Sequence, residues 1–121
     1  MIEHIQRGEI YLADLNPISG CEQGGIRPVL VLQNDIGNNF STTTIVAAIT
    51  TNTKHKHHLP THVSIESREK LFCDSIILLE QIRTVDRQRL IKKLTKLNEQ
   101  EMLLVDKSLL ISIGIMEIGL T

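Results

Sequence analysis

The chain has 121 residues, of which 41% are hydrophobic and 22% are charged, and this is the size and composition of one globular domain. Its formal net charge of −1 at pH 7 excludes a protein that is basic throughout, so a nucleic acid would have to bind at a local patch. Aromatic residues make up only 2%, which argues against a platform of aromatic side chains for stacked bases.

The first predicted element is a strand at 8–15, GEIYLADL. Successive side chains of a strand point to opposite faces of the sheet. Ile10 and Leu12 are therefore expected to face one way, and Tyr11 and Ala13 the other.

A loop of about ten residues, 16–25, comes next, and loops near that length are often functional. Pro28 suits the start of the following strand, 28–33, whose continuous apolar run predicts a central place in a sheet. A cluster of turn-forming residues at 34–39 separates this strand from a second buried strand at 43–51.

The second half of the chain is predicted to alternate loops with further strands. In order, the elements are a polar loop at 52–58, a strand at 61–66 with Val63 and Ile65 inward, a short helical turn at 67–72, a central strand at 75–84, and a short helix at 86–90 capped by Asp86. The pattern at 91–97 is ambiguous, and we favour a strand there.

The last predicted element is a helix from about Glu99 to Met116, because Asn98 and Glu101 form the Asn variant of a capping box. Apolar residues occur almost all round this helix, which is more than a small barrel can cover. We expect a second copy of the chain to cover the remainder, as a homodimer; the alternative is a deep groove within the monomer.

Many short strands followed by one long helix predict a mainly β fold with helices (α+β). The expected architecture is a small, strongly bent antiparallel sheet or barrel with a C-terminal helix, forming a single domain over residues 1–121. Cys21 and Cys73 are too few for a disulfide framework or a zinc set. Without a signal peptide or an apolar run of about 18 residues, the sequence predicts a cytoplasmic protein with no membrane partner.

Arg27 is the first candidate for a functional residue. It lies at the start of a buried strand, directly downstream of Gly24 and Gly25, which let the backbone approach a ligand closely. A guanidinium suits phosphate oxygens, although an arginine at a strand start is most often a solvated edge residue. Glu22 can meet Arg27 and accept a proton if the loop folds back; otherwise it pairs with a surface cation.

Thr50 and Thr51 end the second buried strand, where two hydroxyls can donate hydrogen bonds to a phosphate. Threonine is also an ordinary strand former, so the position alone leaves both interpretations open. Four of the five histidines lie at 55–62, but their spacing is short and irregular and no carboxylate or cysteine is nearby. We therefore expect no metal site and no cofactor, and favour a solvated loop that offers positive charge to an anion.

Gln81 and Arg83 are predicted to project from the same side of one strand, where they are able to read base edges or anchor phosphates. They equally fit a polar outer face. Asn34, directly after its strand, is either a turn residue or a base reader.

Five segments, in this order, resemble the MazF/PemK family of toxin endoribonucleases, and most closely its Firmicute, Bacillus-type branch. The segments are RGEIYLADLNP (7–17), GCEQGGIRPVLVLQND (20–35), TTIVAAITT (43–51), LPTHVSI (59–65) and DSIILLEQIRTVD (74–86). The resemblance covers nearly the whole chain, and the motifs EQGGIRPVLV and LLEQIRT are specific to it.

The resemblance implies an SH3-like barrel that forms a homodimer, on the fold also used by the gyrase poison CcdB. It implies cleavage of single-stranded RNA at a short motif, UACAU-like in the most similar branch, without a metal. The implied partner is a MazE-type antitoxin, through which alone the protein would be associated with DNA.

Residue by residue, the resemblance implies catalytic roles for Arg27, Thr50 and Glu22. It implies RNA contacts by Cys21, Gln23, Asn34, Thr51, Leu59, Gln81 and Arg83. Cys21 departs from the serine expected in relatives. The alternatives to a nuclease are a gyrase-directed poison on the same fold, a non-catalytic RNA-binding module, and a structural domain.

Overall fold

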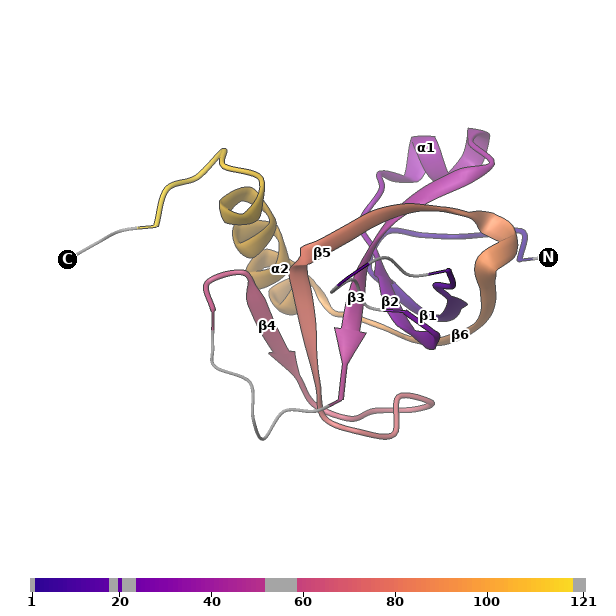
Figure 1. Cartoon of the computed structure of the whole chain (residues 1–121), viewed down its shortest axis with the longest axis horizontal. Helices are drawn as coiled ribbons and strands as arrows, with labels where there is room; N and C mark the ends of the chain where they lie inside the picture. The colour runs from indigo at the N-terminus through magenta and orange to yellow at the C-terminus, as the bar shows by residue number, and fades with distance from the viewer. Residues whose placement is uncertain (1, 18–19, 21–23, 52–58, 119–121) are drawn as a thin grey trace.

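The computed structural model describes residues 2–17, 20, 24–51 and 59–118. In chain order its elements are β1 (Glu9–Asp14), β2 (Ile26–Val31), α1 (Asp35–Phe40), β3 (Thr43–Thr50), β4 (His62–Ile65), β5 (Ser75–Asp86), the 3-10 turn η1 (Arg87–Arg89), β6 (Leu90–Lys96) and α2 (Glu99–Ser112). The strands form one antiparallel sheet in the order β4-β5-β3-β2-β1-β6, and α2 lies beside β4 and β5 (Figure 1). The predicted fold class, a bent antiparallel sheet with a C-terminal helix, is confirmed.

Strand β1 alternates as predicted, and both of its faces are covered. Ile10 and Leu12 pack in a hydrophobic cluster that also contains Val105 of α2. Tyr11 and Ala13 face the opposite way and pack in a second cluster, formed mainly by β2 and β3. The sheet therefore bends around two apolar cores, which explains why so few of its strands show a polar face.

Strand β5 extends two residues beyond the predicted strand at 75–84 and contains a bulge. Ala47 of β3 lies opposite Ile82, whereas the next residue, Ala48, lies opposite Leu78. The pairing between β3 and β5 thus skips residues 79–81 of β5. Such an insertion bends a strand, and β5 changes direction along its length in Figure 1.

The prediction of a simple turn at 34–39 is wrong, because most of this segment forms α1. The Asn34 side chain caps the helix by accepting a hydrogen bond from the Gly37 N–H at 2.8 Å. Asn38 is buried, and its Oδ1 accepts a hydrogen bond from Thr44 Oγ1 at 2.8 Å. This bond to β3 is a tertiary contact, which the local turn composition does not reveal.

The two short helices predicted near β5 have different outcomes. Asp86 caps η1 by accepting a hydrogen bond from the Gln88 N–H at 2.9 Å, which confirms the predicted cap. The helical turn predicted at 67–72 is wrong, since Arg68 and Leu71 instead form a β-bridge across a tight turn. The Arg68 guanidinium binds both carboxylate oxygens of Glu101 at 2.6 Å, so the turn is fastened to α2 as well as by its own backbone hydrogen bonds between Arg68 and Leu71.

The strand favoured at 91–97 is confirmed as β6, and helix α2 begins where the sequence predicts but ends earlier. The capping box of Asn98 and Glu101 is present. At the C-terminus, Gly114 adopts a φ of +81°, the Gly114 N–H donates to the Ile111 carbonyl, and the Ile115 N–H donates to the Leu110 carbonyl. This is a Schellman motif, which ends the helix at Ser112 instead of Met116.

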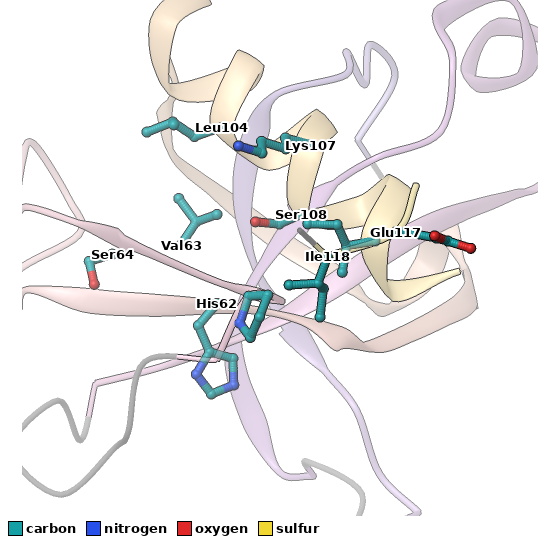
Figure 2. Close-up of a pocket in the computed structure, with 10 residues that line it drawn as sticks. His62, Val63, Ser64, Leu104, Lys107, Ser108, Glu117 and Ile118 are labelled. Atoms are coloured by element: carbon teal, nitrogen blue, oxygen red, sulfur yellow. The ribbon is translucent and has the colours of Figure 1, made fainter. Parts of the chain in front are cut away.

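Much of the apolar surface of α2 is exposed. Val105 is buried, but Leu103 is 69% and Leu104 58% exposed. A groove of about 710 Å³ separates α2 from β4, and Leu104 is one of its walls (Figure 2). The described residues leave these α2 side chains exposed, which favours cover by a second copy over the alternative of a deep groove within the monomer. No helix among the described residues is long and apolar enough to cross a membrane.

Candidate active site

The sheet register brings Arg27 and Thr50 to the same place. The ladder between β2 and β3 pairs Val31 with Val46 and Val29 with Ala48. Continued by two residues in the same register, it sets Arg27 opposite Thr50. Directly opposed residues of an antiparallel pair project to the same face with Cβ atoms about 5 Å apart. Two candidates that are 23 positions apart in the sequence therefore share one end of one face.

Arg27 is held in place by the backbone before it. Its Nε–H donates a hydrogen bond to the Gly24 carbonyl at 2.6 Å, and the residue is only half-exposed. Gly25 has a φ of +76°, which a residue with a side chain rarely adopts. The Gly25 N–H donates to Asn16 Oδ1 at 3.0 Å, and the Leu15 N–H donates to the Gly25 carbonyl at 2.9 Å. The glycines thus let the end of the loop fold tightly onto the end of β1, which orients the guanidinium.

Two further arginines lie at this end of the sheet. The Arg83 guanidinium donates to the Leu15 carbonyl at 2.9 Å, and the Arg89 guanidinium donates to the Asp14 carbonyl at 3.1 Å. Arg89 also donates to the Asn16 carbonyl. Arg83 and Arg89 therefore bind the backbone where β1 leaves the sheet, and Arg27 pairs with Ala13 of β1 close by. We call these three arginines the patch; Asp14 and Asp86 lie beside Arg89.

Sequence reasoning predicted Arg83 but missed Arg89. Arg89 belongs to η1, and the sequence around it indicates only a short helix. The bend of β5 and the turn after it return Arg89 to the end of β1. The sequence signal for Arg89 is the alternation of arginine and glutamine in RQR (87–89), and this pattern is too common to assign a role.

Several predicted site residues lie outside the described part of the chain. These are Glu22, Cys21 and Gln23, together with the histidines at positions 55, 57 and 58. Thr50 is 5% exposed and ends β3, and the next residue, Thr51, is exposed. Of the three proposed catalytic residues, the structure therefore describes Thr50, which is buried at the end of β3, and Arg27, whose guanidinium is anchored to Gly24.

The structure does not bring Asn34 to this end. Strand β2 has six residues and spans about 17 Å. Arg27 lies near its first residue and Asn34 follows its last, where the amide oxygen is occupied as the cap of α1. Gln81 lies in the β5 bulge, where the strict alternation behind its predicted shared side with Arg83 is interrupted. Leu59 is half-exposed in a turn before β4.

Comparison with known proteins shows which family the chain belongs to. Residues 6–113 match the family described as PemK-like, MazF-like toxin of type II toxin-antitoxin system. The chain is also 57% identical over 112 residues to a protein named endoribonuclease MazF from Staphylococcus epidermidis, covering 92% of both chains. This chain belongs to the MazF/PemK toxin family. The resemblance seen in the sequence, including its Firmicute character, is confirmed.

Solved structures of MazF proteins have the same fold. A MazF from Deinococcus radiodurans superposes with a TM-score of 0.77 at 24% identity, covering 92% of this chain and 97% of that one. A mycobacterial endoribonuclease in complex with its cognate antitoxin superposes with a TM-score of 0.76 at 21% identity, covering 92% and 96%. At this level of identity the likeness establishes the fold, which is that of MazF structures.

Proposed function

We propose that the protein is the toxin of a type II toxin–antitoxin pair and an endoribonuclease that cleaves single-stranded RNA at a short, UACAU-like motif. The observation that supports this proposal is the β2–β3 register, which sets Arg27 opposite Thr50 when it is continued by two residues, in a chain of this family. Cleavage of messenger RNA would inhibit translation and growth.

The proposed reaction uses the ribose 2′-OH as nucleophile. Its oxygen attacks the adjacent phosphorus, the bond from phosphorus to the 5′-oxygen breaks, and the products are a 2′,3′-cyclic phosphate and a 5′-OH. The 2′-OH must lose a proton, the phosphorane must be stabilised, and the leaving oxygen must gain a proton. No step requires a metal.

Arg27 is assigned to the phosphorane. A guanidinium stays charged at any physiological pH, and preorganised charge at a developing anion is usually the largest single catalytic effect. The bond from its Nε–H to Gly24 fixes the side chain while leaving its terminal nitrogens to donate to phosphate oxygens. Thr50 is assigned as a hydroxyl donor to the same phosphate, and its burial limits the positions that the hydroxyl can take.

Glu22 is the proposed general base, because it is the acid nearest in sequence to Arg27 within the loop. A histidine of segment 55–62 is the second candidate. His62 is the one member of that segment's histidines that the structure describes, and its Nε2 lies 2.9 Å from Glu80 Oε2. His62 lies at the start of β4, and its Nε2 is already bonded to the Glu80 carboxylate of β5. We therefore prefer the other histidines of the segment as the second candidate for the general base.

The remaining predicted residues are proposed to bind RNA. Arg83 binds the backbone at the end of β1, Thr51 follows Thr50, Gln81 lies in β5 and Leu59 lies in the turn before β4. Asn34, Cys21 and Gln23 complete the set, with Asn34 the weakest because it caps α1.

Two partners are proposed: a second copy of the chain, from the exposed surface of α2, and an antitoxin, from the family. We propose a homodimer in which a second copy covers the apolar side chains of α2. We also propose a MazE-type antitoxin that occupies the RNA site, since a relative of the same fold has been solved with its cognate antitoxin. The protein would act in the cytoplasm and meet DNA only through that antitoxin.

The deciding experiment is digestion of a mixed single-stranded RNA pool by the purified protein, followed by mapping of the new ends. Defined fragments with 5′-OH and cyclic phosphate ends, formed in excess EDTA, are expected. Loss of cleavage in EDTA that a divalent ion restores would contradict the metal-free mechanism. Intact RNA combined with double-strand breaks in DNA only when gyrase is present would instead identify a gyrase poison.

A further inference from the structure

The bulge in β5 is anchored on both sides of its backbone. Within it, the Leu79 N–H donates to the Thr61 carbonyl at 2.8 Å. The Leu79 carbonyl accepts a hydrogen bond from Ser112 Oγ, at the last residue of α2, at 2.6 Å. A bulge interrupts the ladder hydrogen bonds between two strands. Here the Leu79 backbone instead bonds to the segment before β4 and to the end of α2.

Glu80, the next residue, fastens the bulge to the segment before β4. One carboxylate oxygen accepts a hydrogen bond from Thr61 Oγ1 at 3.0 Å, and the other lies 2.9 Å from His62 Nε2, which must carry the proton of this bond. Burial raises the pKa of Glu80, but the hydrogen bonds, led by that from His62, outweigh it and lower the pKa overall. The carboxylate is therefore ionised at neutral pH and accepts from both neighbours.

Each segment that Glu80 joins leads to a residue proposed to contact RNA. Thr61 and His62 close a tight turn in which the His62 N–H donates to the Leu59 carbonyl at 2.9 Å. Leu59, at the start of that turn, is 49% exposed. On the other side, Gln81 follows Glu80 directly within the bulge. The carboxylate thus lies between the two segments and sets their separation.

We propose that Glu80, together with Thr61 and His62, is a positioning group for base recognition: it holds the Leu59 turn and the Gln81 bulge at the separation that fits the bases of the cleaved motif. The inference rests on the proposed function, because it takes Leu59 and Gln81 to contact RNA. Glu80 itself acts through these segments and does not touch the phosphate that Arg27 and Thr50 bind.

A merely structural brace and a positioning group predict different kinetics. Loss of a brace lowers the free energy of unfolding and leaves the relative cleavage of different sequences unchanged. Loss of a positioning group reduces discrimination between sequences, because specificity is a difference between transition-state affinities. The useful quantity is therefore the ratio of kcat/KM for the cleaved motif to kcat/KM for single-base variants of it.

The test uses Glu80→Gln and Thr61→Val in the full chain. In Glu80→Gln the negative charge is lost: the amide oxygen can still accept from His62 Nε2 and the amide N–H₂ can donate to Thr61 Oγ1, so two charge-assisted hydrogen bonds become weaker neutral ones. We expect kcat/KM on the motif to fall about tenfold, mainly through KM, and the discrimination ratio to fall by a similar factor. Thr61→Val removes one donor and should lower the ratio about threefold, while His62→Gln, which keeps a donor, should retain most of it.

The matched control is Glu66→Gln, an exposed acid one residue after β4 that should leave the ratio unchanged. An equal loss of kcat/KM on all sequences in Glu80→Gln, with the ratio intact, would overturn the proposal and leave a structural brace. If Glu80→Gln does not fold, an unchanged ratio in Thr61→Val overturns it. Absence of RNA cleavage by the unaltered protein would instead refute the proposed function itself.

Discussion

Arg27 on β2 lies opposite Thr50 on β3 when the Val29–Ala48 register is continued to the strand ends. Arg27 is anchored through Gly24, and Thr50 is buried at the end of β3, so both side chains are restricted in the positions that they take. Catalysis by preorganised charge depends on such fixed geometry, because no energy is then spent on orienting the groups during the reaction.

Replacing Arg27 by Ala should lower kcat by at least about 100-fold, since removal of one donor to a developing anion costs that much in other enzymes. Single-turnover cleavage of the mapped RNA motif measures the effect. Lys92→Ala removes one positive charge from the exposed surface of β6 and is the matched control. Near-normal cleavage by Arg27→Ala, with the control also normal, would show that the site lies elsewhere.

Replacing Thr50 by Val should remove the hydroxyl while keeping the shape of the side chain, and should lower kcat about 10- to 100-fold, corresponding to about 1–3 kcal/mol. Thr50→Ser keeps the hydroxyl and should retain most of the activity. The same single-turnover assay compares the two variants. Equal loss in both would attribute the effect to packing at the end of β3 rather than to a hydrogen bond.

If Glu22 is the general base, Glu22→Gln should reduce the rate at neutral pH and flatten the acid limb of the pH–rate profile, because an amide cannot accept the 2′-OH proton. The measurement is kcat/KM across pH 4–9 for both proteins. Glu3→Gln, which alters an exposed acid near the N-terminus, serves as the control. A parallel acid limb in Glu22→Gln would transfer the role to another group.

Replacing Leu103 by Glu should dissociate the proposed homodimer, because it introduces a charge on an exposed apolar face of α2 that a second copy would cover. Analytical ultracentrifugation should give a dimer for the unaltered chain and a monomer for the variant. Phe72→Glu changes another exposed apolar residue, in the loop before β5, and should leave the dimer intact. A monomeric unaltered chain would contradict the proposed assembly.

Hydrogen bonds from Arg68 lower the pKa of Glu101, partial burial opposes them, and the bond from the Asn98 N–H adds to the lowering. A carboxylate whose folded pKa lies below its unfolded value of about 4.3 stabilises the protein above that value, and this stabilisation is lost as pH falls through the folded pKa. Glu101→Gln should therefore cost about 1–2 kcal/mol in the free energy of unfolding at pH 7 and much less at pH 3.

Urea unfolding at the two pH values measures this difference. The amide introduced by Glu101→Gln would still offer an oxygen to the Asn98 N–H, so the helix cap is retained and the charge is what changes. Glu99→Gln, in the same first turn of α2, is the control. An equal loss of stability at both pH values would mean that packing, rather than the ion pair with Arg68, explains the effect.

Local patterns were sufficient where structure depends on neighbours in the chain. The alternation in β1, the Asp86 cap and the capping box of α2 all depend on residues within a few positions of one another, and all three are confirmed. Patterns failed where a distant partner decided the conformation. Asn38 stabilises α1 through Thr44 on β3, and Arg68 is held by Glu101 on α2.

The sequence by itself determined the family, the strand-rich order of elements, and the candidacy of Arg27 and Thr50, because these depend on motifs and on period-two alternation. Only the tertiary structure decided which residues meet. The β2–β3 register, continued by two residues, sets Arg27 opposite Thr50; the turn after β5 brings Arg89 to the end of β1; and the bulge in β5 places Glu80 against Thr61 and His62. Sheet register and bulges arise from packing across the whole fold, so no local stretch of sequence specifies them.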